Sequence, residues 1–266
     1  MRLMKVGINS AIIKEISGRG LSLDELPVEV VEIGFDDIPL LTEKGINWNL
    51  IEELLTLGVE FTIHAPCSDG KNISLDLGVD SRRNIRIMED VFRISQALNA
   101  KYVVIHGGDI RKSYYTSFVN TKRQLMELSV IGEEYGVKLE IENLLDNRIG
   151  AFPHEFLPFL DENVSTCFDV GHAFLVSRKY GIRLEEFLLI PDIEHVHLHD
   201  NSGFWDEHRA LGEGVIPFNV ILPAIAKIEP KNVILEIRRY RDSENVIRSI
   251  ELVKKLKPRV KREVLI

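Results

Sequence analysis

The amino-acid sequence predicts an α/β fold, a closed (β/α)8 or TIM barrel. Two observations carry this prediction: strand patterns alternate with helical patterns along the chain, and eight such units fit into 266 residues. Barrels of this kind typically use about 250 residues as one domain. We therefore expect a single domain over residues 1–266. An open, doubly wound sheet is the alternative, but Ser10-Ala11-Ile12 stands where such folds carry a glycine-rich phosphate loop.

The predicted strands are short segments rich in β-branched and aromatic residues. They cover residues 5–9, 28–34, 60–64, 102–106, 137–142, 164–169, 195–199 and 232–236. Between them, apolar residues at helical spacing predict helices within residues 48–57, 87–98, 118–135, 156–160, 185–189, 218–228 and 246–256. Asp80 or Ser81 is the expected cap of the second helix and Ser243 that of the last, and Gly136 suits a left-handed residue after the third.

Composition excludes several classes of protein. The net charge is −8, and no apolar run is long enough to cross a membrane. The negative net charge argues against a protein that coats nucleic acid, and the lack of a long apolar run argues against a membrane partner. Bound cations would offset some carboxylates, so a local basic surface is still allowed. Cys67 and Cys167 form no CxxC pair, so neither a disulfide framework nor a zinc knuckle is indicated. We expect a cytoplasmic protein.

Residues that can bind metal stand at the ends of six predicted strands. In chain order they are His64, His106, Glu142, Asp169, His197 or His199, and Glu236. The carboxyl ends of the strands of a parallel barrel meet at one rim, which is the catalytic face. Residues far apart in the sequence thus become neighbours, and together they predict a metal centre.

The stretch 195–214 is the densest in imidazoles and carboxylates. His195, His197 and His199 alternate with apolar residues and therefore share one face of a strand, with His195 the deepest. Asp206 and His208 follow in a loop that can enclose a cation. Together with His172, which follows the sixth strand, the candidate ligands number five histidines and four carboxylates. One divalent ion cannot use so many, since zinc takes about four ligands.

Short motifs surround these residues. They are IHA at His64, VVIHGG at His106, IEN at Glu142, FDVGHAF at Asp169 and His172, HLHD at His197, DEHRALGEG at Asp206 and His208, and LE at Glu236. The motifs resemble the xylose-isomerase-like TIM barrel superfamily, and within it endonuclease IV (AP endonuclease family 2). The resemblance covers nearly the whole chain.

This resemblance implies a centre of up to three Zn²⁺ ions, with Mn²⁺ or Mg²⁺ as alternatives. The implied ligand sets are His64, His106 and Glu142; Glu142, Asp169, His197 and Glu236; and His172, Asp206 and His208. Glu142 would bridge the first two ions. Sugar isomerases and epimerases of the same superfamily share several of these positions.

Two loops depart from the endonuclease pattern. The resemblance implies an arginine and a tyrosine that hold an abasic nucleotide out of the stack, whereas this chain has Gly34-Phe35-Asp36-Asp37 and Ala65-Pro66-Cys67-Ser68 there. Two other loops on the same rim are basic and aromatic, which suits phosphate contact and base stacking, or else marks solvated helix entries. Their candidate substrate-binding residues are Arg111, Lys112, Tyr114, Arg238, Arg239 and Arg241.

Two enzymatic functions fit these residues. The leading hypothesis is a phosphodiesterase that uses metal-activated water to cleave DNA at abasic sites, or a related phosphate ester. The alternative is a single-metal isomerase or epimerase of a small sugar or sugar phosphate, in which Glu142 and Glu236 move a proton at carbon. The candidate catalytic residues are these two and Asp169. The number of ligands favours the phosphodiesterase, because a single-metal isomerase would not use Asp206 and His208 as ligands. A third hypothesis, a barrel that binds zinc without turnover, is disfavoured because open ligand sets are typical of catalytic sites.

Overall fold

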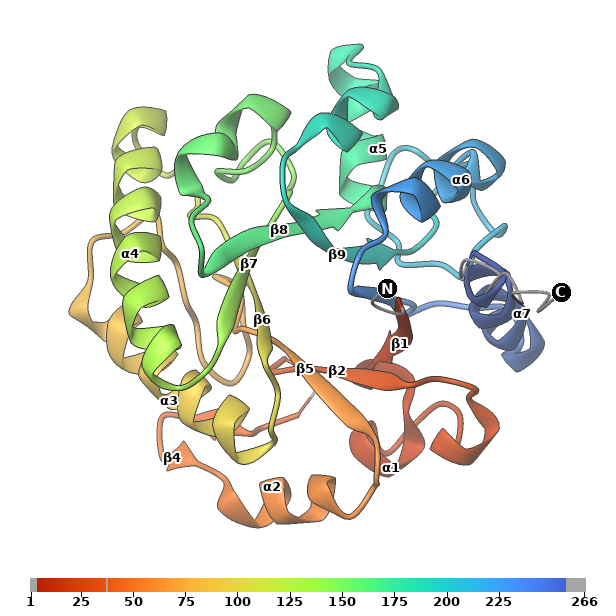
Figure 1. The fold of residues 1–266 in the computed structure, drawn as a ribbon, viewed down its shortest axis with the longest axis horizontal. Helices are drawn as coiled ribbons and strands as arrows, with labels where there is room; N and C mark the ends of the chain where they lie inside the picture. The colour runs from red at the N-terminus through yellow and green to blue at the C-terminus, as the bar shows by residue number, and fades with distance from the viewer. Residues whose placement is uncertain (1–3, 37, 257–266) are drawn as a thin grey trace, which may run out of the picture.

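Eight parallel strands form a closed barrel with the helices around its outside (Figure 1). The computed structural model describes residues 4–36 and 38–256, so Asp37 and both ends of the predicted domain lie outside the described residues. In their order around the barrel, the strands are β1 (Lys5–Asn9), β10 (Asn232–Leu235), β9 (Ile193–Leu198), β8 (Val164–Asp169), β7 (Lys138–Glu142), β6 (Tyr102–His106), β5 (Glu60–His64) and β2 (Val30–Gly34). The predicted (β/α)8 barrel is confirmed, and the alternative of an open sheet is wrong.

The helices follow the strands in the chain and cover the barrel from outside. They are α1 (Lys14–Ser17), α2 (Trp48–Leu55), α3 (Arg82–Ala97), α4 (Tyr114–Glu134), α5 (Val170–Tyr180), α6 (Phe218–Ile228) and α7 (Ser243–Lys254). Ser81 caps α3, and Gly136 has the predicted left-handed backbone, with φ of 71°. The prediction for α7 is wrong by one residue: Asp242 is the cap and accepts the N–H of Asn245, because its carboxylate reaches the free donors of the first turn.

Three segments differ from the predicted helices. Residues 156–160 do not form an α-helix, because Pro158 cannot donate the hydrogen bond that would continue a helix. Within them only the 3-10 turn η4 (Leu157–Phe159) is helical, and a second 3-10 turn, η3 (Pro153–Glu155), precedes them. Residues 185–189 likewise lie in a 3-10 helix, η5 (Leu184–Leu189). Helical spacing misses α5, because Gly171, His172 and Ala173 make up most of its buried face and only Val170 and Val176 are large apolar residues. A small hairpin of β3 (Leu41–Thr42) and β4 (Gly45–Ile46) is also unpredicted.

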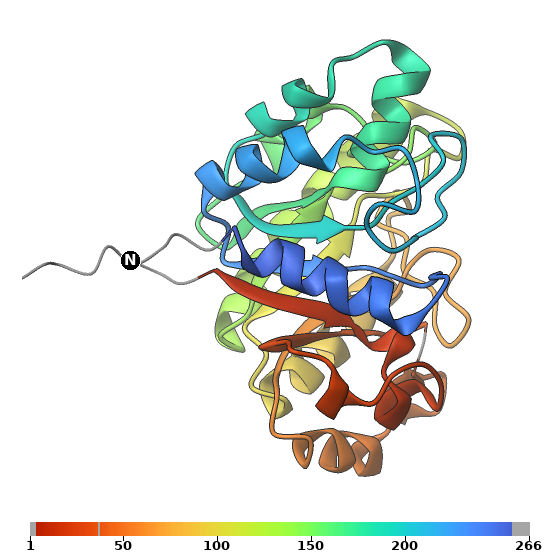
Figure 2. The same ribbon diagram turned by 90° about the vertical axis from the view of Figure 1, so that its right-hand side faces the viewer.

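The register of the strands places the candidate ligands side by side. His106 on β6 is the partner of Glu142 on β7, and Asp169 on β8 is the partner of His197 on β9. Neighbouring strands lie about 4.8 Å apart, so these side chains are within reach of a shared ion. The strands run toward the end of the barrel that carries the long loops, on the right in Figure 2. The candidate ligands therefore lie at the loop-bearing rim, as predicted.

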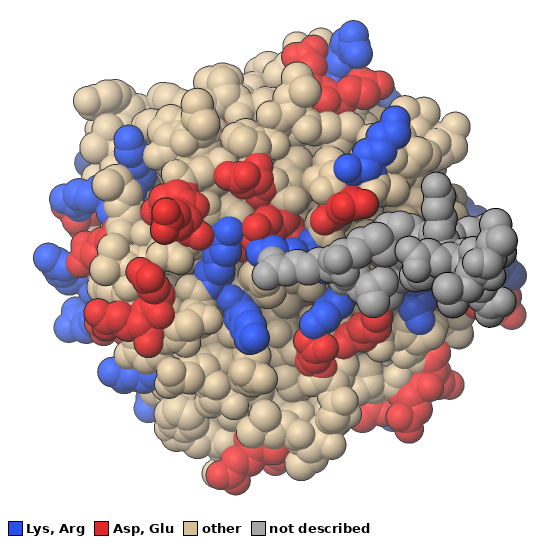
Figure 3. All heavy atoms as spheres, viewed as in Figure 1, with Lys and Arg blue, Asp and Glu red and all other residues tan. Residues whose placement is uncertain are grey.

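The interior of the barrel is polar below that rim. Glu140 and His195 stand two residues before Glu142 and His197, and both are fully buried, as the alternation of strand side chains predicts. The face at the other end of the strands carries interspersed acidic and basic side chains (Figure 3). Among the described residues, no helix is both long and apolar enough to cross a membrane.

Candidate metal centre

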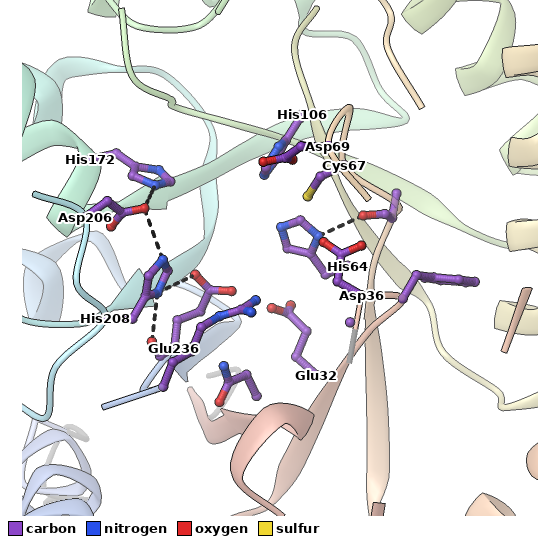
Figure 4. Close-up of a pocket in the computed structure, with 15 residues that line it drawn as sticks. Glu32, Asp36, His64, Cys67, Asp69, His106, His172, Asp206, His208 and Glu236 are labelled. Atoms are coloured by element: carbon purple, nitrogen blue, oxygen red, sulfur yellow. Dashed lines mark hydrogen bonds and ion pairs between the residues drawn. The ribbon is translucent and has the colours of Figure 1, made fainter. Parts of the chain in front are cut away.

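A cavity of about 210 Å³ opens at the loop-bearing rim. One side of it carries His172, Asp206, His208 and Glu236 (Figure 4). The other side carries His64, Cys67, Asp69 and His106. The carboxylate of Glu32 lies between the two sides. The nine predicted ligands fall into three neighbouring groups at this rim, so the structure brings all of them together.

The strand-borne group consists of four residues from the ends of β7 to β10. They are Glu142, Asp169, His197 and Glu236, each with a potential ligand atom within 4.8 Å of the others, and all four are buried. From Nδ1 of His197, the nearest oxygens of the three carboxylates lie at 3.5 Å, 3.9 Å and 3.7 Å. Asp169 Oδ2 and Nδ1 of His197 have no hydrogen-bond partner. Buried polar atoms without partners are costly, so this donor set fits a divalent cation.

A buried chain of alternating carboxylates and imidazoles supports His197 from below. Glu32 on β2 places Oε1 at 2.9 Å from His197 Nε2 and Oε2 at 3.2 Å from His195 Nε2. His195 Nδ1 in turn lies 2.7 Å from Glu140 Oε2. A carboxylate behind a ligand histidine fixes its ring and its proton, so Glu32 leaves Nδ1 of His197 facing the three carboxylates. Sequence reasoning missed Glu32, whose only signal was an acidic residue inside an apolar strand.

Asp169 links this group to the loops. Its Oδ1 accepts the backbone N–H of His172 at 2.6 Å, and it thereby caps α5. Asn143 holds the backbone of Asp169 from both directions, because its amide accepts the N–H at 2.7 Å and donates to the carbonyl at 2.8 Å. The helix thus starts at the rim and directs His172 into the cavity.

The loop-borne group consists of His172, His199, Asp206 and His208. Asp206 Oδ2 lies 3.2 Å from His172 Nε2 and 3.1 Å from His208 Nε2. Sequence analysis did not assign His199 to this group, but its ring stacks on that of His208 with centroids 4.0 Å apart. His208 has a left-handed backbone with φ of 48°, which is uncommon outside glycine and typical of constrained functional positions.

Backbone carbonyls orient three of the predicted ligand histidines. The Nδ1 atoms of His64, His172 and His208 lie 2.9 Å, 3.0 Å and 2.9 Å from the carbonyls of Ala65, Asn143 and Glu236, respectively. An Nδ1–H donated to a carbonyl leaves Nε2 as the free ligand atom. His106 differs, because its Nδ1 lies 3.2 Å from the Arg148 guanidinium, which can only donate.

Ionisation of the carboxylates suits cation binding. Burial would raise the pKa of Glu142, but His106 and His197 lower it well below the usual value. Burial acts in the same sense on Glu236, and His197 and His208 outweigh it, so its pKa is also lowered. For His64, burial lowers the pKa but the hydrogen bond to Glu142 overcomes this and raises it to about 9. The proton on His64 therefore stays until a cation displaces it.

The six predicted substrate-binding residues are not gathered at the cavity. Arg238 lines it. Arg111 donates to Asp76 at 2.8 Å, and Tyr114 donates to Glu155 at 2.7 Å. Lys112, Arg239 and Arg241 are exposed and do not line this cavity.

The fold and this rim define the class of the protein: a parallel α/β barrel whose strand ends converge in a centre of histidines and carboxylates. Residues 24–256 match the family described as xylose isomerase-like TIM barrel. The chain belongs to that family, and the predicted resemblance to it is confirmed.

Relatives share the whole barrel. The uncharacterized protein MJ1614 of Methanocaldococcus jannaschii is 30% identical, over 85% of this chain and 89% of that protein. Among solved structures, a D-tagatose 3-epimerase-like protein has a TM-score of 0.75 and 27% identity, and the match covers 95% of this chain and 97% of that one. The TTHB071 protein from Thermus thermophilus, soaked with ZnCl2, has a TM-score of 0.66 and 20% identity over 95% of this chain and 98% of that one, which shows the fold alone.

Proposed function

We propose that the protein is a divalent-metal-dependent isomerase or epimerase of a small sugar or sugar phosphate. The observation that carries this proposal is the strand-borne group, in which three buried carboxylates and one imidazole meet, and Glu236 of this group lines the cavity. One ion in that group would supply a Lewis acid that polarises a carbonyl or hydroxyl of the substrate. The likeness to a D-tagatose 3-epimerase-like protein supports the same class.

Glu142 and Glu236 are the proposed acid–base pair. They stand on β7 and directly after β10, with His197 of β9 between them. Both are carboxylates near neutral pH because neighbouring imidazoles lower their pKa. One would take the proton from the substrate carbon, and the other, after taking up a proton from solvent, would return a proton to the neighbouring carbon or to the opposite face; the first would then release its proton to solvent. Asp169 would hold the ion without moving a proton.

The shape of the site supports a small substrate. The cavity is bounded by the loops that carry Cys67, Asp206 and His208, and of the predicted DNA contacts only Arg238 lines it. Arg111 and Tyr114 are engaged with carboxylates of their own chain. A bound sugar would find hydroxyl partners in His172 and Asp206 at the cavity wall.

A phosphodiesterase of the endonuclease IV type is the second candidate. The observation that favours it is the presence of two more donor groups, around Asp206 and around His64, beside the strand-borne group. A phosphoester centre with several ions can hold both the attacking and the leaving oxygen, whereas the sugar reaction needs one ion.

One experiment separates the two candidates. The protein loaded with Mn²⁺ or Zn²⁺ is incubated in D2O with a panel of ketoses and ketose phosphates, and in parallel with an oligonucleotide that carries one abasic site. We expect sugar conversion with deuterium incorporated next to the carbonyl, which NMR detects, and an intact oligonucleotide. Chelator-treated protein is the control and should be inactive until the ion is restored. Strand incision without conversion of any sugar contradicts the proposal and supports the phosphodiesterase.

A further inference from the structure

A thiol lies among the imidazoles on one side of the cavity. One ligand atom each of His64, Cys67 and His106 lies within 4.8 Å of the other two. Figure 4 shows the Cys67 side chain directed toward the two rings. We propose that the Cys67 thiolate joins these two imidazoles as a ligand of a zinc-type ion. The proposal concerns a site beside the strand-borne group and does not depend on the proposed sugar reaction.

Glu142 is the fourth donor of the proposed set. Its Oε2 lies 3.2 Å from His64 Nε2 and 3.0 Å from His106 Nε2, so both rings converge on the same oxygen. Its other oxygen, Oε1, lies 3.5 Å from His197 Nδ1 and so faces the strand-borne group. Two nitrogens, one oxygen and one sulfur make a full tetrahedral set for zinc. A site with four protein ligands has no open position, which is typical of a retained ion.

Ion binding requires the Cys67 side chain to close on the two imidazoles and on Glu142. Donors around a tetrahedral zinc lie about 3.5 Å apart, given bond lengths of about 2.0 to 2.3 Å. The backbone of Cys67 is held in place, because its carbonyl accepts the N–H groups of Gly70 and Leu75 at 3.1 Å each. The thiol is partly exposed, so rotation of the side chain can supply the closure. The thiol releases its proton to solvent on binding, since the thiolate is the ligand form.

Arg148 can adapt to an ion on His106. Binding through Nε2 leaves the remaining proton of His106 on Nδ1, where the guanidinium also presents a donor. The guanidinium must then turn away, and it already has two carboxylate partners, Asp109 at 3.2 Å and Asp69 at 3.4 Å. Loss of its contact with His106 therefore leaves Arg148 paired.

Ligand type separates this site from the strand-borne group. Thiolate and imidazole favour zinc, whereas a set dominated by carboxylates also suits manganese or magnesium. The thiolate therefore predicts a centre with two different ions: a firmly held zinc at Cys67 and an exchangeable ion among Glu142, Asp169, His197 and Glu236.

Cobalt is the probe that tests this ligand directly, because sulfur bound to Co²⁺ gives a charge-transfer band in the near ultraviolet. The chain has two cysteines, so Cys67→Ser and Cys167→Ser form a matched pair. Metal-free protein is titrated with Co²⁺ while absorbance is recorded, and circular dichroism checks the fold of each variant. We expect the band in wild type and in Cys167→Ser, and its loss in Cys67→Ser. Cys167→Ala replaces the control if the serine variant does not fold, since that residue is fully buried.

Zinc retention gives a second readout that does not use activity. After dialysis against a chelator, elemental analysis should find one zinc more per chain in wild type than in Cys67→Ser. Loss of an outer hydrogen-bond partner of a metal ligand already weakens binding about 10- to 100-fold, so loss of a direct ligand should cost at least about tenfold in zinc affinity. Cobalt bound without a sulfur band in wild type, or a band that persists in Cys67→Ser, overturns the proposal.

Discussion

Candidate ligands on strand ends and candidate ligands on loops are positioned in different ways. Glu142, Asp169 and Glu236 stand at or directly after strand ends, are no more than 5% exposed, and are positioned by the register of the barrel. Cys67 and Asp206 stand on loops and are partly exposed. Backbone hydrogen bonds from Gly70 and Leu75 hold Cys67, and contacts with His172 and His208 hold Asp206. Strand ends hold side chains in positions set by the barrel, which suits residues whose geometry the reaction requires. Loops can change ligands or specificity without altering the barrel. We therefore expect the largest effects from the strand-borne side.

The largest effect should come from removing one proton-moving carboxylate. Glu142→Gln and Glu236→Gln should each reduce kcat for sugar conversion by about 100- to 10,000-fold, because a positioned acid or base contributes that much. Glu60→Gln is the matched control, since this exposed residue stands at the opposite end of β5 and should leave kcat unchanged. Activity retained in either site variant, with the fold intact by circular dichroism, would show that the acid–base pair lies elsewhere.

The next effect concerns the support of His197. Glu32→Gln removes the charge that fixes the His197 ring at 2.9 Å, and we expect affinity for the catalytic ion to fall about 10- to 100-fold. Glu140→Gln acts one step further along the same chain, through His195, and should have the smaller effect. Competition with a chelator measures both affinities. Equal losses in the two variants would mean that burial, and not the contact with His197, decides the effect.

A smaller effect should come from the loop-borne side. Asp206→Asn combined with His208→Ala leaves the strand-borne group in place, so kcat at saturating sugar should fall less than about tenfold while KM rises. In a phosphodiesterase these residues would hold an ion that stabilises phosphate oxygens, and the rate should then fall about a hundredfold or more. Steady-state kinetics on both substrates distinguishes the cases. A hundredfold loss of kcat on sugar would assign the loop-borne group to the chemical step.

The smallest effect is on stability and depends on pH. Burial lowers the pKa of His195, but Glu140 and Glu32 overcome this and raise it from the usual 6.5 to about 9. A folded-state pKa above the unfolded value stabilises the protein fully below about 6.5, and this contribution is lost as the pH rises through about 9. The Tm of the metal-free protein should therefore fall between pH 7 and pH 9.5, with His64 adding to the fall in the same window. In His195→Gln, calorimetry should find a flatter dependence; an unchanged slope would place the titration elsewhere.

The barrel and its ligand-bearing rim can be predicted from the sequence alone. Alternating strand and helix patterns predict eight units, and a side-chain period of two places His195 one layer below His197. Because parallel strand ends converge, the ligand-type residues at those ends had to become neighbours. The basic loops were not determined in this way: a run such as 238–241 has the same sequence pattern whether it contacts a ligand or solvent.

Tertiary structure decided which atoms face one another. No local pattern shows that Glu32 on β2 lies behind His197 on β9, or that the Arg148 guanidinium faces His106, because these contacts join residues distant in the chain. Cys67 lacks a CxxC partner in sequence and gains its significance only from the two imidazoles beside it in space. Periodicity reports which face of an element is buried, whereas the ring nitrogen that remains free for a ligand depends on hydrogen bonds that form only when the barrel closes.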